Sequence, residues 1–305
     1  MSERRHLTPL PLGQEIPFSK GLMARALIVT GLDPVSAHLI ARRAERDLTE
    51  RAATALDLDR LGELAADVIG EEEASRTVRR LRRLDVLQRL DLPLLLLIGG
   101  TTGTGKSTIA TEAAHRLGIT RVTSTDFIRQ TMRAFFSKEF MPSVHYSSFE
   151  ARLALTRAEE EESGDAALLG FLDQTRNVLV GANAALERAA TERWSMVLEG
   201  VHLVPGMVAG EVPGAFVVQC VVAIEDENLH RSHFWVRDHA TEGLRPLDKY
   251  LDALPQIREI QEFLLERARR YDVPIVVNDS LENALAEVMD LVLRRADQLV
   301  GIPAG

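Results

Sequence analysis

The stretch that most constrains the fold of this chain runs over residues 94–107 and reads LLLLIGGTTGTGKS. The apolar run at its start predicts a buried parallel strand. The spacing Gly100-x-x-x-x-Gly105-Lys106-Ser107 follows at once, and a helical pattern, IATEAAHRL, comes next. A strand before and a helix after are the context that a phosphate-binding loop requires. The alternative is a glycine-rich turn that binds nothing.

The residue types of this loop suit the phosphates of a nucleotide. Glycines let the backbone turn tightly with its N–H groups pointing inward, and the start of the next helix adds partial positive charge. We expect Lys106 to reach the β- and γ-phosphates of ATP and Ser107 to offer its hydroxyl to Mg²⁺. The predicted nucleotide-binding residues are Gly100, Thr101, Thr102, Gly103, Thr104, Gly105, Lys106, Ser107 and Thr108.

Composition excludes several classes of partner. The 305 residues include 36 Lys and Arg against 45 Asp and Glu, and the net charge of −9 disfavours general binding to nucleic acid. One cysteine rules out an internal disulfide framework and fits a reducing compartment. No apolar run approaches the roughly 20 residues that span a membrane, and the N-terminus lacks the apolar core of a signal peptide. We therefore expect a cytoplasmic protein with a small-molecule partner; the sequence leaves the oligomeric state open.

Residues 1–90 predict a small helical domain that precedes a kinase domain of residues 91–305. Helical patterns cover residues 22–31, 35–51, 58–69 and 71–90. The segment Pro17-Phe18-Ser19-Lys20, followed by a helix and a turn at Gly31, resembles the ATP-cone regulatory module. That resemblance implies that Lys20 and Arg25 contact nucleotide phosphates. A helical bundle that only packs against the rest of the chain is an equal alternative.

Beyond the phosphate loop, residues 121–125 (RVTST) predict a short strand that delivers Asp126 to the carboxyl end of the sheet. Ligands of open α/β sheets bind at that end. Asp126, Arg129 and Arg133 have helical spacing and share one face, so they suit an acceptor that carries a hydroxyl and an anionic group. The alternative is an N-cap aspartate with two solvated arginines.

Further candidates for the acceptor site lie in two loops. In the loop of residues 135–150, His145, Tyr146 and Ser147 are candidate substrate contacts or ordinary polar groups. Residues 150–162 and 165–193 predict two long helices. The next strand, residues 194–198, ends at Glu199, where nucleotide kinases keep an acid that orients the water shell of the metal. His202 follows as a candidate substrate contact, with a structural hydrogen bond as the alternative.

The last third of the chain predicts two more strands, over residues 216–224 and 274–277, and a closing helix over residues 282–299. Between the two strands, a charged helical segment of residues 225–270 predicts a lid. We expect Arg231 and Arg237 to close over the transferring phosphoryl group, although a solvated helix with ion pairs is possible. Five strands that alternate with helices predict a parallel α/β sandwich with right-handed crossovers.

An ordered set of motifs resembles the 2-phosphoglycerate kinase family. The motifs are GGTTGTGKSTIATEAAHRLGITRVTSTDFIRQTMR, MPSVHYSSFEA, VLEGVHLVPG, HRSHFWVRDHA and RPLDKYL. The resemblance implies a P-loop three-layer sandwich with strand order 2-3-1-4-5, and transfer of the ATP γ-phosphate to the 3-hydroxyl of 2-phosphoglycerate, which gives 2,3-bisphosphoglycerate. His233 and Trp235 depart from the arginine and the aliphatic residue expected in the lid motif, which puts the acceptor preference in doubt.

The predicted mechanism is in-line phosphoryl transfer by positioning and charge neutralisation. Asp126 would orient or deprotonate the acceptor hydroxyl, and Arg129 and Arg133 would hold its anionic group. Ser107 would bind Mg²⁺, with Glu199 or Asp126 supporting the ion through water.

Three other functions stay open. The first is a kinase for another metabolite, such as a sugar, a nucleoside or an inositol phosphate. The second is a nucleotide-gated regulatory ATPase. The third is a binding module without chemistry, which the intact Lys106, Ser107 and Asp126 disfavour.

Overall fold

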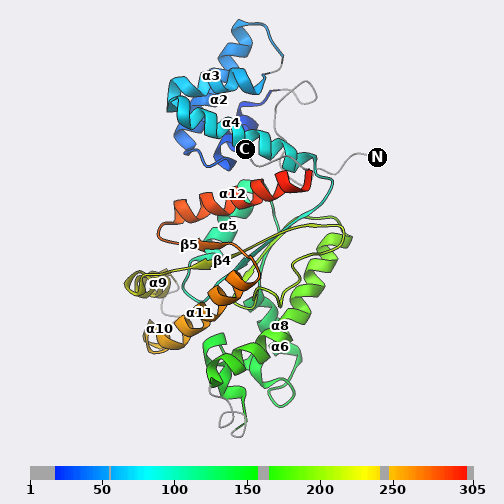
Figure 1. The fold of residues 1–305 in the computed structure, drawn as a ribbon, viewed down its shortest axis with the longest axis vertical. Helices are drawn as coiled ribbons and strands as arrows, with labels where there is room; N and C mark the ends of the chain where they lie inside the picture. Colours follow the sequence, from blue (N-terminus) through cyan, green and yellow to red (C-terminus); the bar gives the residue numbers. More distant parts are fainter. Residues whose placement is uncertain (1–17, 55, 157–164, 241–246, 301–305) are drawn as a thin grey trace. The chain divides into compact units, whose positions relative to one another are not determined.

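The computed structural model describes residues 18–54, 56–156, 165–240 and 247–300 (Figure 1). The chain forms two compact units. A helical unit comprises the described parts of residues 1–92, 113–120 and 285–305, and a sheet unit comprises those of residues 93–112 and 121–284. Within the described ranges, every helix is too short or too polar to cross a bilayer. The division into domains at residue 90 stays a prediction.

A five-stranded parallel sheet forms the centre of the sheet unit. Its strands are β1 (Leu94–Gly99), β2 (Val122–Ser124), β3 (Met196–Gly200), β4 (Phe216–Ala223) and β5 (Ile275–Val277). The order β2-β3-β1-β4-β5 confirms the predicted fold class. All six residues of β1 are buried, because a central parallel strand is covered on both faces. Its uninterrupted apolar run is the sequence signature of that burial.

The register of the sheet brings two functional loops together. On one side of β1, Gly99 lies opposite Gly200 of β3, and on the other side it lies opposite Val221 of β4. Because the strands are parallel, the chain leaves β1 and β3 at the same edge. The phosphate loop therefore begins beside the end of β3, where Glu199 stands.

Helices connect the strands and pack around this sheet. They are α5 (Lys106–Leu117), α6 (Thr125–Phe135), α8 (Ala166–Thr191), α9 (Glu227–Ala240), α10 (Leu247–Asp252) and α11 (Leu254–Arg270), with 3₁₀ turns η1 (Pro142–His145) and η2 (Ser148–Ala154). Leu97 packs with α8, and Val221 and Ala223 pack with α11. Alternate residues of a strand share a face, and Leu97 lies opposite Gln219, so α8 and α11 cover the same face (Figure 1).

The α-helix predicted over residues 150–162 is wrong in its described part. The chain there forms the 3₁₀ turn η2 and is extended at Leu155, and residues 157–164 lie outside the described ranges. The cause is a close approach to α8: a Cβ atom at Gly170 would clash with the backbone of Ala151 and Arg152. The backbone of η2 therefore rests directly on a glycine of α8.

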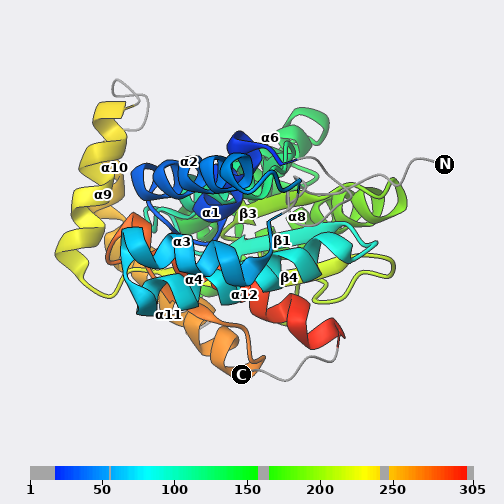
Figure 2. The same cartoon turned by 90° about the horizontal axis from the view of Figure 1, so that it is seen from above.

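The predicted helices of the N-terminal region are confirmed. The helical unit contains α1 (Lys20–Val29), α2 (Pro34–Glu50), α3 (Leu58–Ile69), α4 (Glu71–Arg89) and most of α12 (Leu281–Val300). The side chains of Ser19, Asp33 and Asp57 accept hydrogen bonds from backbone N–H groups of the first turns and fix where three helices begin. Helix α12 lies alongside α4, and Arg83 Nε is 2.8 Å from Asp297 Oδ2 (Figure 2).

Both residues that the ATP-cone resemblance singled out have protein partners. Lys20 Nζ lies 2.9 Å from Glu45 Oε2, and Arg25 Nη2 donates to His115 O at the end of α5, also at 2.9 Å. A nucleotide role for Lys20 and Arg25 stays a prediction.

Candidate active site

The phosphate loop has the backbone conformation that its glycines allow. Gly103 and Gly105 have φ values of 89° and 81°, in the region that residues with a Cβ rarely adopt. A side chain at Gly105 would also clash with Asn278, which approaches the loop from outside. The spacing of glycines in the sequence thus reflects both a backbone requirement and a packing requirement.

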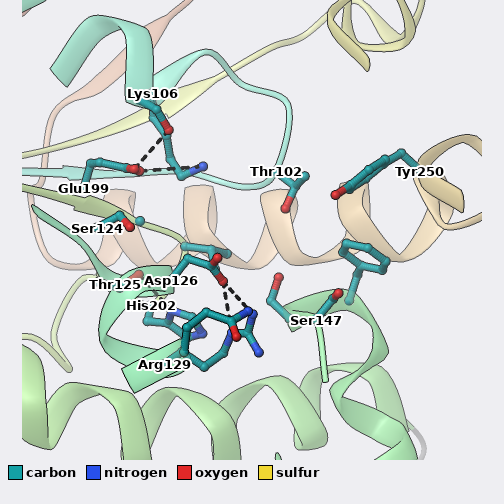
Figure 3. A pocket seen from close by; sticks show the side chains of 16 residues that line it. Thr102, Lys106, Ser124, Thr125, Asp126, Arg129, Ser147, Glu199, His202 and Tyr250 are labelled. Carbon is teal, nitrogen blue, oxygen red and sulfur yellow. Dashed lines mark hydrogen bonds and ion pairs between the residues drawn. The ribbon is translucent and has the colours of Figure 1, made fainter. Parts of the chain in front are cut away.

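A cavity of about 280 Å³ opens beside this loop at the carboxyl edge of the sheet. Figure 3 shows Lys106 and Glu199 at one end of it and Ser147 and Tyr250 at the other, with Asp126 and Arg129 between them. The lining residues are Thr102, Lys106, Ser107, Ser124, Thr125, Asp126, Arg129, Gln130, Ser147, Ser148, Phe149, Glu199, Gly200, Val201, His202 and Tyr250. We call the part around Lys106, Ser107 and Glu199 the phosphate half and the part around Asp126, Ser147 and Tyr250 the acceptor half.

Three side chains meet in the phosphate half. Ser107 Oγ donates to Glu199 Oε1 at 3.0 Å, and Lys106 Nζ lies 3.9 Å from Glu199 Oε2 and donates to Thr101 O at 3.3 Å. Glu199 is buried, and its Oε2 atom has no hydrogen-bond partner among the described residues. A buried carboxylate oxygen left over beside a serine hydroxyl fits a water molecule of a hydrated divalent cation.

The donor set favours Mg²⁺ over a transition metal. In the described ranges, no three His, Cys, Asp or Glu side chains converge on one point, so an ion here would depend on a hydroxyl, on water and on phosphate oxygens. These are the ligands that Mg²⁺ prefers, because it keeps several waters.

In the acceptor half, Arg129 holds Asp126. Arg129 Nε and Nη2 donate to Asp126 Oδ1 at 3.0 and 2.8 Å, and Nη1 donates to Val144 O and Tyr146 O, each at 2.8 Å. Four of the five N–H groups of this buried guanidinium are therefore used. The side chain of Asp126 is 59% exposed and lines the cavity, and both of its hydrogen bonds from Arg129 go to one oxygen, Oδ1.

His202 belongs to a buried hydrogen-bond chain below the cavity. Gln174 Nε2 donates to Ser143 O and Tyr146 O at 2.6 and 3.0 Å, so Gln174 Oε1 faces His202 Nε2 at 2.9 Å and accepts from it. His202 Nδ1 then accepts from Thr125 Oγ1 at 2.8 Å. Burial lowers the pKa of His202 to about 3, which keeps the ring neutral. His202 thus supports the wall with both ring nitrogens bonded to protein.

Three other predicted acceptor contacts lie away from the cavity lining. Arg133 is exposed, and His145 Nε2 donates to Phe136 O at 2.9 Å. The Tyr146 ring lies under Lys138 Nζ, at 4.8 Å, and only its carbonyl takes part in the network. The structure therefore brings Asp126, Arg129, Ser147 and His202 to the cavity, and it places Arg133, His145 and Tyr146 around them.

The two predicted lid arginines differ in what can be said of them. Arg231 Nη2 lies 2.8 Å from Glu227 Oε1 on the exposed side of α9 and does not line the cavity. The side chain of Arg237 lies outside the described residues. Their closure over the phosphoryl group stays a prediction.

Sequence reasoning missed several lining residues of the acceptor half. Ser148 and Phe149 directly follow the loop residues that were singled out, and Tyr250 lies within the motif RPLDKYL. The cluster of hydrogen-bonding side chains in the loop was the available signal. No spacing rule connects Tyr250 to it, because the contact between the Tyr250 and Phe149 rings, 5.7 Å between centroids, arises only from folding.

Comparison with known proteins finds relatives that match most of the chain. No family model matches it. The chain is 33% identical over 281 residues to the 2-phosphoglycerate kinase of Methanopyrus kandleri, covering 91% of this chain and 84% of that protein. It is 36% identical over 263 residues to the protein of the same name from Methanothermobacter thermautotrophicus, covering 86% and 85%. It is 34% identical over 291 residues to the 2-phosphoglycerate kinase of Pyrococcus horikoshii, and the match covers 93% of this chain and 92% of that protein.

Solved structures are more distant. A gluconokinase from Sinorhizobium meliloti 1021 aligns with 70% of this chain and 99% of its own, with a TM-score of 0.38 and 15% identity. A shikimate kinase from Acinetobacter baumannii aligns with 70% of this chain and 96% of its own, with a TM-score of 0.36 and 14% identity. Similarities this low add nothing to what the sheet order establishes about the fold.

Proposed function

Because the chain belongs to the 2-phosphoglycerate kinase family, we propose that it transfers the γ-phosphate of ATP to the 3-hydroxyl group of 2-phosphoglycerate and forms 2,3-bisphosphoglycerate. The observation that carries this proposal is the identity with proteins of that name over nearly the whole of both chains. The cavity adds support, since it joins a phosphate loop to a carboxylate with a free oxygen.

In the proposed reaction, the phosphate half holds the donor. The inward N–H groups of the loop and the Lys106 ammonium bind the β- and γ-phosphates. Ser107 would hold Mg²⁺ directly, and Glu199 would hold it through water, as the unpartnered Oε2 atom suggests. A Mg²⁺ ion held there would neutralise part of the charge on the phosphates.

The acceptor half supplies the base. Asp126 Oδ2 accepts the proton of the acceptor hydroxyl while the hydroxyl oxygen attacks the γ-phosphorus from the side opposite the β–γ bridging oxygen. The bond to that bridging oxygen breaks, and ADP leaves with the electron pair. Arg129 does not need to touch the acceptor for this step, because its bonds to Asp126 Oδ1 already aim Oδ2 at the cavity.

The carboxylate and the 2-phosphate of the acceptor need donors. Lys106 and Arg129 are the Lys and Arg residues that line the cavity within the described part of the chain. Lys106 is assigned to the phosphates of ATP, and Arg129 already bonds Asp126. We therefore assign the contacts to the carboxylate and the 2-phosphate of the acceptor to the hydroxyl groups of Ser147, Ser148 and Tyr250. Arg133 and Arg231 do not line the cavity, so their predicted contacts with the acceptor and the phosphoryl group require the segments that carry them to move toward it. The role of Arg237 stays a prediction.

The test is product analysis with a panel of matched acids. Purified protein with Mg-ATP is incubated with 2-phosphoglycerate, 3-phosphoglycerate or glycerate, and the products are identified by mass spectrometry. We expect a bisphosphorylated product from 2-phosphoglycerate alone, formed far more slowly by the Asp126→Asn variant. Phosphorylation of another acid but not of 2-phosphoglycerate would contradict the proposed acceptor. Release of ADP without a phosphorylated acid would favour a regulatory ATPase.

A further inference from the structure

One face of α9 packs against the outer side of the phosphate loop. His230, His233 and Phe234 have spacings of three and four residues and therefore share a face of the helix. His230 and Phe234 are fully buried, with 0% and 1% of their surfaces exposed. This part of the segment predicted as a lid is thus fixed against the nucleotide site.

Three side chains bind three successive carbonyl groups of the loop. The bonds are His230 Nε2 to Thr102 O at 2.8 Å, His233 Nδ1 to Gly103 O at 2.9 Å and Asn278 Nδ2 to Thr104 O at 2.9 Å. A carbonyl oxygen can only accept, so each nitrogen must carry the hydrogen. His230 and His233 come from α9, and Asn278 directly follows β5. Two separate segments therefore hold the loop from outside.

The geometry of the peptide bond gives these contacts a consequence for the inner side of the loop. In a trans peptide, the C=O of one residue and the N–H of the next point in opposite directions. Holding the carbonyls of residues 102–104 outward therefore aims the N–H groups of Gly103, Thr104 and Gly105 inward. The N–H of Thr104 donates to Thr101 O within the loop, at 3.5 Å.

We propose that His230, His233 and Asn278 are positioning residues for phosphoryl transfer, which preorganise the phosphate loop by clamping its outward carbonyls. We call these three side chains the loop clamp. The inference rests on the proposed function only in that the loop holds the phosphates of a nucleotide. It does not depend on which acceptor is used.

The loop packs directly against the clamp. A Cβ atom at Gly103 would clash with Phe234 and lie 2.8 Å from His230 Nε2. The His230 ring stacks on Phe234, with centroids 5.1 Å apart, and Phe234 stacks on Tyr250 at 5.4 Å. Since Tyr250 lines the acceptor half, one stack of rings fixes the clamp and a wall of the acceptor site together.

The neutral state of the His230 ring suits its hydrogen bond to the loop. Burial lowers the pKa of His230, so the ring stays neutral and donates from Nε2 alone. Its Nδ1 atom has no hydrogen-bond partner among the described residues. The family motif led us to expect an arginine at position 233. This chain has His233 there, and its side chain donates to one carbonyl of the loop, Gly103 O.

The test measures binding of Mg-ADP to the full-length protein by calorimetry. His233→Ala removes the contact to Gly103 O, and His233→Asn restores an N–H donor near the position of Nδ1. We expect His233→Ala to raise the Kd for Mg-ADP about three- to tenfold, the range for loss of one hydrogen bond, and His233→Asn to recover most of it. The KM for the acceptor should stay within about twofold in both variants.

His38→Asn is the matched control, because His38 Nδ1 also contacts a carbonyl, Pro34 O at 2.7 Å, but does so within α2. It should leave the Kd unchanged. An unchanged Kd in His233→Ala would overturn the proposal, and so would equal weakening in His233→Ala and His233→Asn, which would indicate helix packing in place of hydrogen bonding. Failure to phosphorylate 2-phosphoglycerate would leave these binding measurements unaffected, so the two proposals fail separately.

Discussion

The two halves of the cavity are built in different ways. The phosphate half is built around one continuous loop, which ends at Lys106 and Ser107. Glu199 from β3 bonds Ser107, and side chains from α9 and from the residue after β5 hold the outward carbonyls of the loop. The acceptor half is mostly side chains, and these are held by a buried network of Arg129, His202 and Gln174. The comparison teaches that local spacing in the sequence sets the residues of the loop itself, whereas the packing that holds the loop and the whole acceptor half depend on contacts between distant segments.

Replacing Asp126 with asparagine gives the sharpest test of this division. The amide oxygen of the new side chain would still accept from Arg129, but it would not take up a proton, so we expect kcat to fall about 10²- to 10⁴-fold. The Kd for Mg-ADP should change less than about twofold, because the phosphate half is intact. Coupled-assay kinetics and calorimetry measure the two values. Asp59→Asn, which removes an exposed carboxylate bound to Arg82 in the helical unit, should change neither. Unchanged turnover in Asp126→Asn would remove this residue from the mechanism.

Replacing Lys106 with alanine should affect both measurements. Loss of the ammonium removes the cation that we propose binds the β- and γ-phosphates, so we expect kcat to fall about 10²- to 10³-fold, with weaker binding of Mg-ADP. Lys20→Ala removes a lysine that pairs with Glu45 in the helical unit and should leave both values near those of the unaltered protein. If Lys106→Ala lowered turnover while Mg-ADP bound as before, the phosphate half would not be the donor site.

The same contrast explains how far the sequence could predict the molecule. The buried central strand and the phosphate loop were predictable from the residues, because a buried parallel strand is apolar throughout and the loop has fixed glycine spacing. The order of the strands was predicted from the family resemblance. Asp126 and Glu199 were predictable because each stands where a strand ends.

The acceptor wall was harder to predict. Tyr250 reaches Phe149 only through folding. The same holds for the loop clamp, where the bond from His230 to Thr102 joins residues 128 positions apart. Arg129 was assigned to the substrate because helical spacing places it beside Asp126, but spacing does not show that two backbone carbonyls also use it. The turn η2 was mistaken for an α-helix, because a periodic pattern does not reveal a glycine contact with another helix.

The buried network below the acceptor half predicts a dependence of stability on pH. Burial lowers the pKa of His202 to about 3, against 6.5 for the ordinary side chain. Between these values the unfolded chain binds a proton that the folded chain does not, so stability is full above pH 6.5 and is lost as the pH falls toward 3. From pH 7 to pH 5 this residue should lower the free energy of unfolding by about 2 kcal/mol.

Urea denaturation of the unaltered protein and of His202→Asn at both pH values measures this contribution. Other titrating groups cancel in the difference between the two proteins. We expect the difference in the free energy of unfolding to shrink by about 2 kcal/mol at the lower pH, because the variant has no imidazole to titrate. Parallel pH profiles for the two proteins would show that His202 is not held neutral by the fold.

The smallest expected effect concerns the ring that joins the two halves. In Figure 3 the hydroxyl end of Tyr250 faces the cavity on the side of Thr102, while its ring stacks on Phe234. Tyr250→Phe keeps the ring and removes only the hydroxyl, so we expect the KM for the acceptor to rise about three- to tenfold, the Kd for Mg-ADP to stay the same, and the melting temperature to change little. Tyr271→Phe is the matched control, since Tyr271 is half-exposed and packs against Arg267 away from the cavity. If Tyr250→Phe instead weakened Mg-ADP as much as the acceptor, the stacked rings would transmit the change to the loop clamp, and the two halves would form one site.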